Sequence, residues 1–351
     1  MGKKIIINTP DINKPGGVAN FYLGLNGKFK DEVIYNYIGG SSKKSFFVFN
    51  LIADYFRFMV KIFKLKPSII HINPSLDRKS LLRDSVFIII AKLFGKKLLI
   101  SWHGWQMKTE KSISDKHKRL FRFFFGKADG MTVLSEDFKN ALLSWGIKCE
   151  IYVETTLFED SLIEGLDIHN KQLSNDILFL SRVEEKKGIY VVIDSFSDLN
   201  KEIDCRLTIA GSGSELEKTK NYVNDKKIKN IKFAGYVTGE SKISLFKNNS
   251  VFILPSHTEG MPISMLEAMA FGLAVVSRPV GGIKGFFENG KMGYITESIN
   301  PKDYYSILKG LFSDKEKLRE ISIFNHNYAK EKFSASKVSE RLEKIYSSLL
   351  L

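Results

Sequence analysis

The chain has 351 residues, 44% of them hydrophobic and 26% charged, and this globular composition and length predict two domains instead of one core. No stretch holds the roughly eighteen uninterrupted apolar residues that a membrane-spanning helix requires, since the best run, Val86 to Ile90, is soon broken by Lys92. The net charge of +14 lies wholly in residues 1–150, which contain 26 Lys and Arg against 12 Asp and Glu, whereas the remaining residues contain 27 of each sign.

The first half alternates short apolar segments with helical patterns. Its start, MGKKIIINTP, has too short an apolar region for a signal peptide and predicts a first strand, so we expect a cytoplasmic protein. Such alternation predicts parallel strands joined by crossover helices. The predicted strands of this half are 4–8, 33–38, 68–72, 97–101, 131–134 and 150–153.

Two segments of the first half, 43–66 and 116–127, mix Lys and Arg with Phe at near-helical spacing. One interpretation is an amphipathic helix with its Phe face in the core and its Lys face in water. The other is a surface that holds the protein against anionic lipid headgroups. We expect no nucleic-acid partner, because no recognisable binding module accompanies the charge.

Two short motifs of the first half follow predicted strands. PGGVANF, with Gly16 and Gly17, predicts a flexible turn that opens a helix. SWHGW places His103 just after the strand that ends at Ser101. On these residues alone, a plain turn and a structural histidine are sufficient explanations.

The segment after Val153 is polar and lacks a steady period, which predicts an interdomain connection. Beyond it the alternation resumes, and the terminal run from Ser336 predicts a helix. Cys149 and Cys205 are far apart and outside any CxxC or Cys/His cluster, so we expect reduced thiols. The predicted strands of the second half are 177–180, 206–210, 231–233, 251–254, 274–277 and 293–295.

The motif SRVEEKKG places Arg182 and Lys187 after the first strand of the second half. Cations at this position suit a diphosphate, although two solvated basic residues would look the same in sequence. The nearby GSGSE at Gly211 is only a fragment of a phosphate-loop pattern.

Residues 251–282 predict a strand, a polar loop, a helix over 264–271 and a second strand. In parallel sheets ligands sit at the carboxyl ends of strands, and a helix N-terminus suits a phosphate. Glu259 precedes this helix and Glu267 lies near its start. Two acids beside an anion site are consistent with a ligand that carries hydroxyls as well as phosphate. Alternatively, Ser264 and Glu267 form a capping box that binds nothing.

The string EGMPISMLEAMAFGLAVVSRPVGG, with two Glu separated by seven residues and a later Gly-Gly pair, resembles the signature of glycosyltransferase family 4. Members are retaining, sugar-nucleotide-dependent enzymes of the GT-B fold. The resemblance covers nearly the whole chain and is strongest over 176–296. It implies an α/β chain with two doubly wound Rossmann-like domains facing across a cleft. The domains would be an acceptor-binding domain over 1–155, a connection over 156–175, a donor-binding domain over 176–330 and a terminal helix over 331–351 that returns to the first domain.

The resemblance also implies roles for the residues of the second half. Arg182 and Lys187, a better match than Lys186, would bind the donor diphosphate. Glu259 would bind the donor sugar, and Glu267 would hold the ribose hydroxyls.

Further positions are implied at the same site. Backbone N–H groups near Gly260 and Met261 would assist Glu259. His103 would contact the donor sugar through an orienting hydrogen bond, and the Gly16-Gly17 turn would lie near the phosphate and acceptor. The GSGSE loop would be mainly structural.

We therefore expect a retaining transferase that moves a sugar from a UDP-, GDP- or other nucleotide-sugar to a lipid-linked or nascent surface glycan, as in lipopolysaccharide, O-antigen or capsule synthesis. We expect the enzyme to lie peripherally on the cytoplasmic face of an anionic inner membrane. No Asp-x-Asp pair occurs, so we expect neither a metal nor another cofactor. The alternatives are a sugar-nucleotide epimerase and a catalytically inactive nucleotide-binding scaffold.

Overall fold

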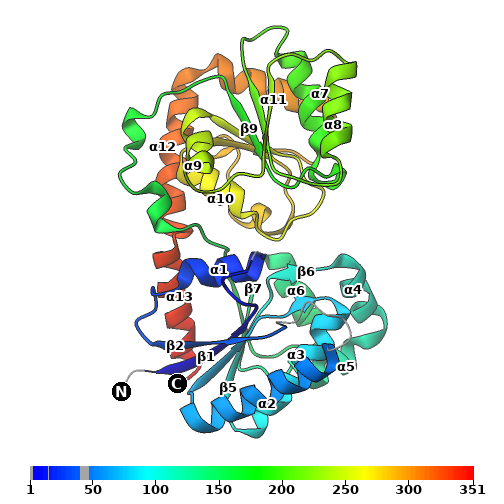
Figure 1. Ribbon diagram of the computed structural model, residues 1–351, viewed down its shortest axis with the longest axis vertical. Coiled ribbons are helices and arrows are strands. Elements are labelled where there is room, and N and C mark those ends of the chain that lie inside the picture. The colour runs from blue at the N-terminus through cyan, green and yellow to red at the C-terminus, as the bar shows by residue number, and fades with distance from the viewer. Residues whose placement is uncertain (1–2, 15, 40–46) are drawn as a thin grey trace. The chain divides into compact units, whose positions relative to one another are not determined.

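The computed structural model describes residues 3–14, 16–39 and 47–351 (Figure 1). The chain divides into two compact units. The first unit comprises Met1–Leu157 together with Ala335–Leu351, and the second unit comprises Phe158–Ser334. Residues 43–46 of the first basic segment lie outside the described residues.

The first unit is built on a six-stranded parallel sheet with the order β2-β1-β3-β5-β7-β8. Its central strands are continuous apolar runs because helices cover both of their faces. The order reverses between β1 and β3, and the carboxyl ends of strands at such a switch point are where ligands bind in open α/β sheets. The strands are β1 (Lys4–Thr9), β2 (Glu32–Tyr37), β3 (Ile69–Ile72), β5 (Lys97–Ser101), β7 (Gly130–Val133) and β8 (Glu150–Val153).

Helices and one small extra sheet complete this part of the first unit. Asp77 caps α3 by accepting hydrogen bonds from the backbone N–H groups of Lys79 and Ser80. β4 (Ser75–Leu76) pairs with β6 (Gly104–Trp105), and the sequence did not predict these two short strands. The helices are α1 (Gly17–Leu25), α2 (Phe47–Leu65), α3 (Arg78–Leu93), α4 (Met107–Ser112), a π-helical turn (Ile113–His117), α5 (Lys118–Phe125) and α6 (Glu136–Ser144).

The terminal helix α13 (Ala335–Ser348) packs on the first sheet, as the family resemblance implies. Its buried residues join a hydrophobic cluster with Ile5 and Ile7 of β1 and with Phe21 of α1. Tyr346 Oη also lies 2.8 Å from Nδ1 of the buried His71 in β3. Both apolar burial and a polar contact therefore hold α13 to the first unit.

The second unit is built on another six-stranded parallel sheet, with the order β11-β10-β9-β12-β13-β14. The order reverses between β9 and β12, which defines the switch point of this unit. The expected class, two doubly wound parallel sheets, is confirmed. The strands are β9 (Ile177–Leu180), β10 (Leu207–Ala210), β11 (Ile231–Gly235), β12 (Val251–Leu254), β13 (Ala274–Ser277) and β14 (Gly293–Ile295).

The connection that leads into the second unit is irregular but ordered, with 3₁₀ turns at Asp160–Ile163 and Ile168–Asn170. Lys171 anchors it, because its buried ammonium group donates to the carbonyl oxygens of Phe246 and Phe271 at 3.0 and 2.7 Å. Burial lowers the pKa of Lys171 to about 7. The helices of this unit are α7 (Ile189–Leu199), α8 (Leu216–Asp225), α9 (Gly239–Asn248), α10 (Ile263–Ala270), α11 (Pro301–Ser313) and α12 (Lys315–Lys332).

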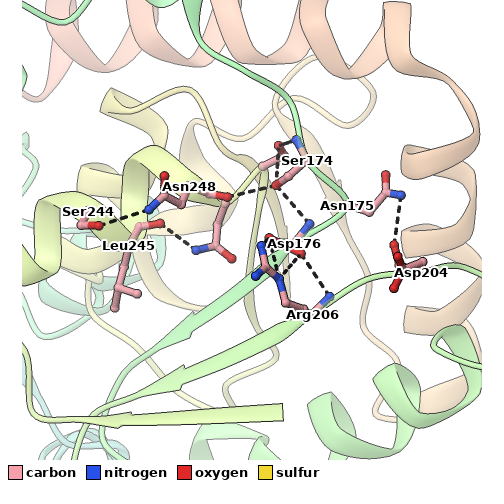
Figure 2. A network of polar contacts seen from close by, with 10 residues as sticks. Ser174, Asn175, Asp176, Asp204, Arg206, Ser244, Leu245 and Asn248 are labelled. Carbon is pink, nitrogen blue, oxygen red and sulfur yellow. Dashed lines mark hydrogen bonds and ion pairs between the residues drawn. The ribbon is translucent and has the colours of Figure 1, made fainter. Parts of the chain in front are cut away.

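A polar network joins the amino ends of the central strands of the second sheet (Figure 2). Asp176, just before β9, accepts hydrogen bonds from the Arg206 guanidinium, the shortest of them 2.6 Å long. Ser174 Oγ donates to the carbonyl of Asn248, the last residue of α9. The network ties the starts of β9 and β10 to the end of α9, on the edge of the sheet away from the carboxyl ends of the strands.

Candidate functional site

Two loops meet at the switch point of the second sheet, one after β9 (181–188) and one after β12 (255–262). The backbone N–H of His257 donates to the carbonyl of Lys186 at 2.9 Å, which links the two loops. Gly188 has a φ of +77°, and a Cβ there would lie 2.5 Å from the carbonyl oxygen of Pro255. Only glycine permits this backbone conformation together with so close an approach.

An ion pair connects the two loops. Lys187 Nζ lies 2.6 Å from Glu259 Oε1, and the two side chains are only 10% and 11% exposed. Lys186 has a 53% exposed side chain and pairs with Glu184 instead. The structure thus brings together the Lys and the first Glu that the sequence singled out, although they lie 72 positions apart.

Arg182 lies in the same loop as Lys187, directly after β9. Its guanidinium donates to Glu184 Oε1 at 2.9 Å, and its side chain is 63% exposed. The GSGSE loop supports the backbone beside it, because Val183 N–H donates to the carbonyl of Ser212 at 2.9 Å. Arg182 is therefore a solvent-accessible cation beside the buried Lys187.

The loop with Glu259 is held from a second side by the Gly-Gly pair after β13. Gly281 has a φ of +56°, and a Cβ there would lie 2.1 Å from the carbonyl oxygen of Glu259. Gly282 N–H donates to the carbonyl of Gly260 at 2.6 Å. The side chain of Met261 is buried. The backbone of this loop is therefore fixed by close packing.

The capping-box interpretation of Ser264 and Glu267 is wrong. α10 begins at Ile263 after an N-cap Pro262 with no side-chain cap, so Ser264 already lies inside the helix. Glu267 accepts a 2.7 Å hydrogen bond from Lys242 on α9. Burial raises the pKa of Glu267, while the Lys242 ammonium acts in the opposite direction.

The glycine motif of the first unit lies after β1, at the switch point of its own sheet. α1 begins at Gly17, with Gly16 as its N-cap, and Asn20 N–H donates to the carbonyl of Gly16 at 2.8 Å. The predicted turn that opens a helix is confirmed at these residues. A helix N-terminus at this position presents backbone N–H groups at the carboxyl edge of the sheet.

His103 lies after β5 at the carboxyl edge of the first sheet. Its Nε2 is 3.1 Å from Asn73 Oδ1, which also accepts a 2.7 Å hydrogen bond from Tyr22. Because this oxygen only accepts, Nε2 carries the proton and Nδ1 is left as an acceptor. Burial lowers the pKa of His103 to about 4, so the ring is neutral at neutral pH. A neutral, oriented imidazole fits a hydrogen-bonding role.

Two residues of these sites were not predicted from the sequence. Lys242 is one lysine among many in a helical segment, and no local pattern marks it as the partner of Glu267. Asn73 directly follows β3 at the first switch point, a position that could have indicated it. Among the residues that the structure describes, no group of three or more His, Cys, Asp or Glu is placed to hold a metal ion.

Comparisons with known proteins bear on both units. Residues 167–327 match the family model of glycosyl transferases group 1. The amylovoran biosynthesis glycosyltransferase AmsK of Erwinia amylovora is 25% identical over 309 residues, which cover 84% of this chain and 69% of that protein. The capsular polysaccharide biosynthesis glycosyltransferase CapM of Staphylococcus aureus is 28% identical over 229 residues, covering 62% of this chain and 57% of CapM.

The whole chain is also similar to solved structures. The Anabaena protein HepE in complex with UDP-glucose superposes with a TM-score of 0.74 at 16% identity, covering 98% of this chain and 99% of HepE. At this identity the likeness concerns the fold, and it confirms the expected GT-B architecture. Residues 167–327 are therefore similar to the glycosyl transferases group 1 family, and the chain has the GT-B fold.

Proposed function

We propose that this chain is a retaining glycosyltransferase of family 4 that moves a sugar from a nucleotide diphosphate donor to a lipid-linked or nascent surface glycan. The observation that carries the proposal is the buried Lys187–Glu259 pair at the switch point of the second sheet, beside the exposed Arg182. A dinucleotide-sized ligand binds at such a point in doubly wound sheets.

Arg182 and Lys187 would hold the donor diphosphate. Negative charge grows on this leaving group as the glycosidic bond breaks, so fixed cations stabilise the transition state more than the ground state. Lys187 is already positioned by Glu259, which reduces the reorganisation that the reaction requires. The N-terminus of α10 adds partial positive charge from its unpaired N–H groups.

The two acids would bind hydroxyl groups. Glu259 accepts from the donor sugar, assisted by backbone N–H groups near Gly260 and Met261, and Glu267 accepts from the ribose. Lys242 holds the Glu267 carboxylate in place at 2.7 Å. His103 would donate an orienting hydrogen bond to the donor sugar, and the Gly16-Gly17 turn would bind the phosphate.

Retention would follow from front-face attack. The departing phosphate accepts the proton of the acceptor hydroxyl while the anomeric carbon has oxocarbenium character, so no nucleophilic carboxylate is needed. In this scheme the protein's cations act on the diphosphate in place of a metal. The complex of HepE with UDP-glucose supports the donor class. The roles of AmsK in amylovoran biosynthesis and of CapM in capsular polysaccharide biosynthesis support a surface-glycan product.

We also propose that the protein lies peripherally on the cytoplasmic face of an anionic membrane, and exposed apolar side chains of the first unit support this. The interpretation that its Phe residues face the core is only partly right, since Phe58, Phe121 and Phe125 are buried but other apolar side chains are exposed. Among the described residues, no helix combines the length and hydrophobicity needed to cross a bilayer. Among the described side chains of α2 and α5, the exposed large apolar ones are Phe49, Ile52, Phe56, Phe63, Leu120 and Phe123.

A sugar-nucleotide screen tests the proposed transferase. Thermal shift across UDP-, GDP- and other nucleotide-sugars should identify a donor, because a ligand of the native state raises apparent stability. With that donor and a glycan acceptor, NMR of the product should show a retained anomeric configuration. Arg182→Ala and Glu259→Ala should each lower turnover by at least about 10²-fold.

Three results would contradict the proposal. Rapid interconversion of the donor without an acceptor would indicate an epimerase. Unchanged turnover in Arg182→Ala and Glu259→Ala would show that these residues do not belong to the catalytic site. An inverted product would remove the front-face mechanism.

Membrane association has its own test. The protein should sediment with anionic vesicles at low salt and dissociate as salt rises, because the Debye length shrinks from about 30 Å at 0.01 M to about 8 Å at 0.15 M. Binding that is indifferent to lipid charge and to salt would contradict this part of the proposal.

A further inference from the structure

Two adjoining pockets lie in the first unit, between α3, α4, the π-helical turn and α5. They share Arg78, Thr109 and Ser112 in their walls, so they adjoin each other, and we call them the two compartments of one depression. Neither compartment includes a residue of the glycine turn or the histidine motif. The depression is therefore separate from the site residues proposed for the first unit.

One compartment is an apolar pocket of about 250 Å³. Leu81 and Leu82 of α3 and Phe121, Phe124 and Phe125 of α5 form its walls. The side chain of Leu82 is 75% exposed at its rim. The volume is just below the range of about 300–1,000 Å³ for pockets that bury a drug-sized ligand, so the pocket suits part of a hydrocarbon chain.

The other compartment is larger, about 720 Å³, and basic. Five cations line it against two carboxylates, and one of these carboxylates, Asp77, is already engaged in capping α3. Within the described part of the chain, none of the five cations forms an ion pair. They are Arg78, Lys79, Lys108, Lys111 and Lys116.

We propose that the depression binds one anionic lipid, with its phosphate headgroup in the basic compartment and the start of a hydrocarbon chain in the apolar compartment. The charge of the basic compartment selects an anion, and the walls of the neighbouring pocket select an apolar chain joined to it. This inference rests on the proposed membrane association and makes it specific. It replaces adsorption by surface charge with a defined lipid site.

Intrinsic tryptophan fluorescence can report on ligand binding at this site. All three of its tryptophans belong to the first unit, and two of them pack against the pocket wall. Trp102 lies 5.7 Å from Phe121 and 5.2 Å from Phe125, and Trp145 lies 4.9 Å from Phe121, measured between ring centroids. A bromine atom on a chain inside the pocket would be separated from an indole by a single aromatic ring.

Fluorescence quenching of the full-length protein tests the proposal. We expect 11-bromoundecyl phosphate, used as a monomer below its aggregation concentration, to quench tryptophan emission saturably. Undecyl phosphate should compete with it, and inorganic phosphate alone should compete poorly. The matching bromoundecyl trimethylammonium probe should bind about tenfold more weakly, because its headgroup has the wrong sign.

Variants separate the two compartments. Leu82→Asp should abolish quenching, whereas Leu143→Asp, which changes a 47% exposed leucine on α6, should not. Lys111→Glu should weaken binding of the phosphate probe and strengthen binding of the ammonium probe. Lys148→Glu changes an exposed lysine outside both pockets and should leave the binding of both probes unchanged. Equal quenching by both probes in all variants would overturn the proposal.

Vesicles separate this inference from the proposed function. With anionic vesicles whose phosphatidylglycerol carries brominated chains, we expect binding accompanied by quenching. Binding without quenching would overturn the lipid site and leave membrane association standing. Quenching by the monomeric probe without vesicle binding would support the site and remove membrane association. Sugar transfer to a soluble acceptor, measured in parallel, should be unchanged in Leu82→Asp.

Discussion

The two units share an architecture but differ in the polar groups at their switch points. In the second unit the central groups are charged pairs, Lys187 with Glu259 and Lys242 with Glu267. In the first unit, by contrast, they are neutral and hydrogen-bonded, with His103 held by Asn73. The lysines of the second unit suit a ligand on which negative charge develops, whereas the neutral His103 and Asn73 can only exchange hydrogen bonds with a ligand. Under the proposed function, this difference assigns the electrostatic part of catalysis to the second unit.

The largest expected effect follows from removing the buried cation of the second unit. Lys187→Met should lower turnover by about 10²–10³-fold, because it removes a fixed charge from the leaving diphosphate. It should also destabilise the unit by about 3 kcal/mol, since the buried Glu259 is left without its partner. Turnover with a matched donor and acceptor and chemical denaturation measure the two effects.

A double variant separates the two effects of this substitution. Lys187→Met with Glu259→Gln should recover much of the lost stability, because no uncompensated charge remains, but should not recover turnover. Lys186→Met is the matched control, since that exposed lysine lies one position away. Recovery of turnover in the double variant would show that Lys187 acts only as a structural partner.

The second prediction concerns the neutral histidines of the first unit. Burial lowers the pKa of His103 to about 4 and that of His71 to about 3, from 6.5. Below pH 6.5 the unfolded chain therefore binds protons that the folded chain does not. The free energy of unfolding decreases as the pH is lowered from 6.5 to the pKa values of the folded state. For His103 the lowering of the pKa from 6.5 to about 4 corresponds to a loss of on the order of 3 kcal/mol in the free energy of unfolding over this pH range.

Denaturation as a function of pH checks this second prediction. His103→Gln should reduce the slope of stability against pH between 6.5 and 4, because the proton-binding difference of His103 between the folded and unfolded chain is removed. His117→Gln removes an exposed histidine of the same unit and serves as the control. A slope in His103→Gln identical to that of the unchanged protein would contradict the neutral state of His103.

The third and smaller effect concerns the partner of Glu267. Lys242→Met should raise KM for the donor about tenfold with little change in kcat, because Glu267 would lose the group that orients it for the ribose. Lys247→Met, an exposed lysine on the same helix α9, is the control. A fall in kcat with unchanged KM would place Lys242 on the reacting centre instead.

Most of the fold could be predicted from the sequence, because its strands are marked by local sequence patterns. The twelve predicted strands all occur, within two residues of the expected bounds, because buried parallel strands are short apolar runs between glycine and polar loops. β4 and β6 were missed because two-residue strands such as Gly104–Trp105 carry no periodic signal. The start of α10 was misplaced because Ser264 looks like an N-cap, whereas Pro262 occupies that position.

The contacts of the candidate site could be predicted only in part. The family resemblance singles out Arg182, Lys187, Glu259 and Glu267, but it does not reveal that Lys187 pairs with Glu259. That contact depends on β9 and β12 being neighbours in the sheet. The exposure of Phe56 on α2 could not be predicted either, because an amphipathic pattern does not show which apolar side chains other elements cover.

The smallest effect is expected at the amino edge of the second sheet, where Arg206 bonds Asp176 (Figure 2). Arg206→Ala should lower the melting temperature by at most a few degrees, because the Arg206 side chain is 72% exposed and water screens the pair. It should leave turnover and donor KM unchanged, because the carboxyl edge of the sheet holds the proposed chemistry. Differential scanning calorimetry and steady-state kinetics measure both, and a loss of turnover comparable with that of Lys187→Met would abolish the contrast between the two edges on which the site assignment depends.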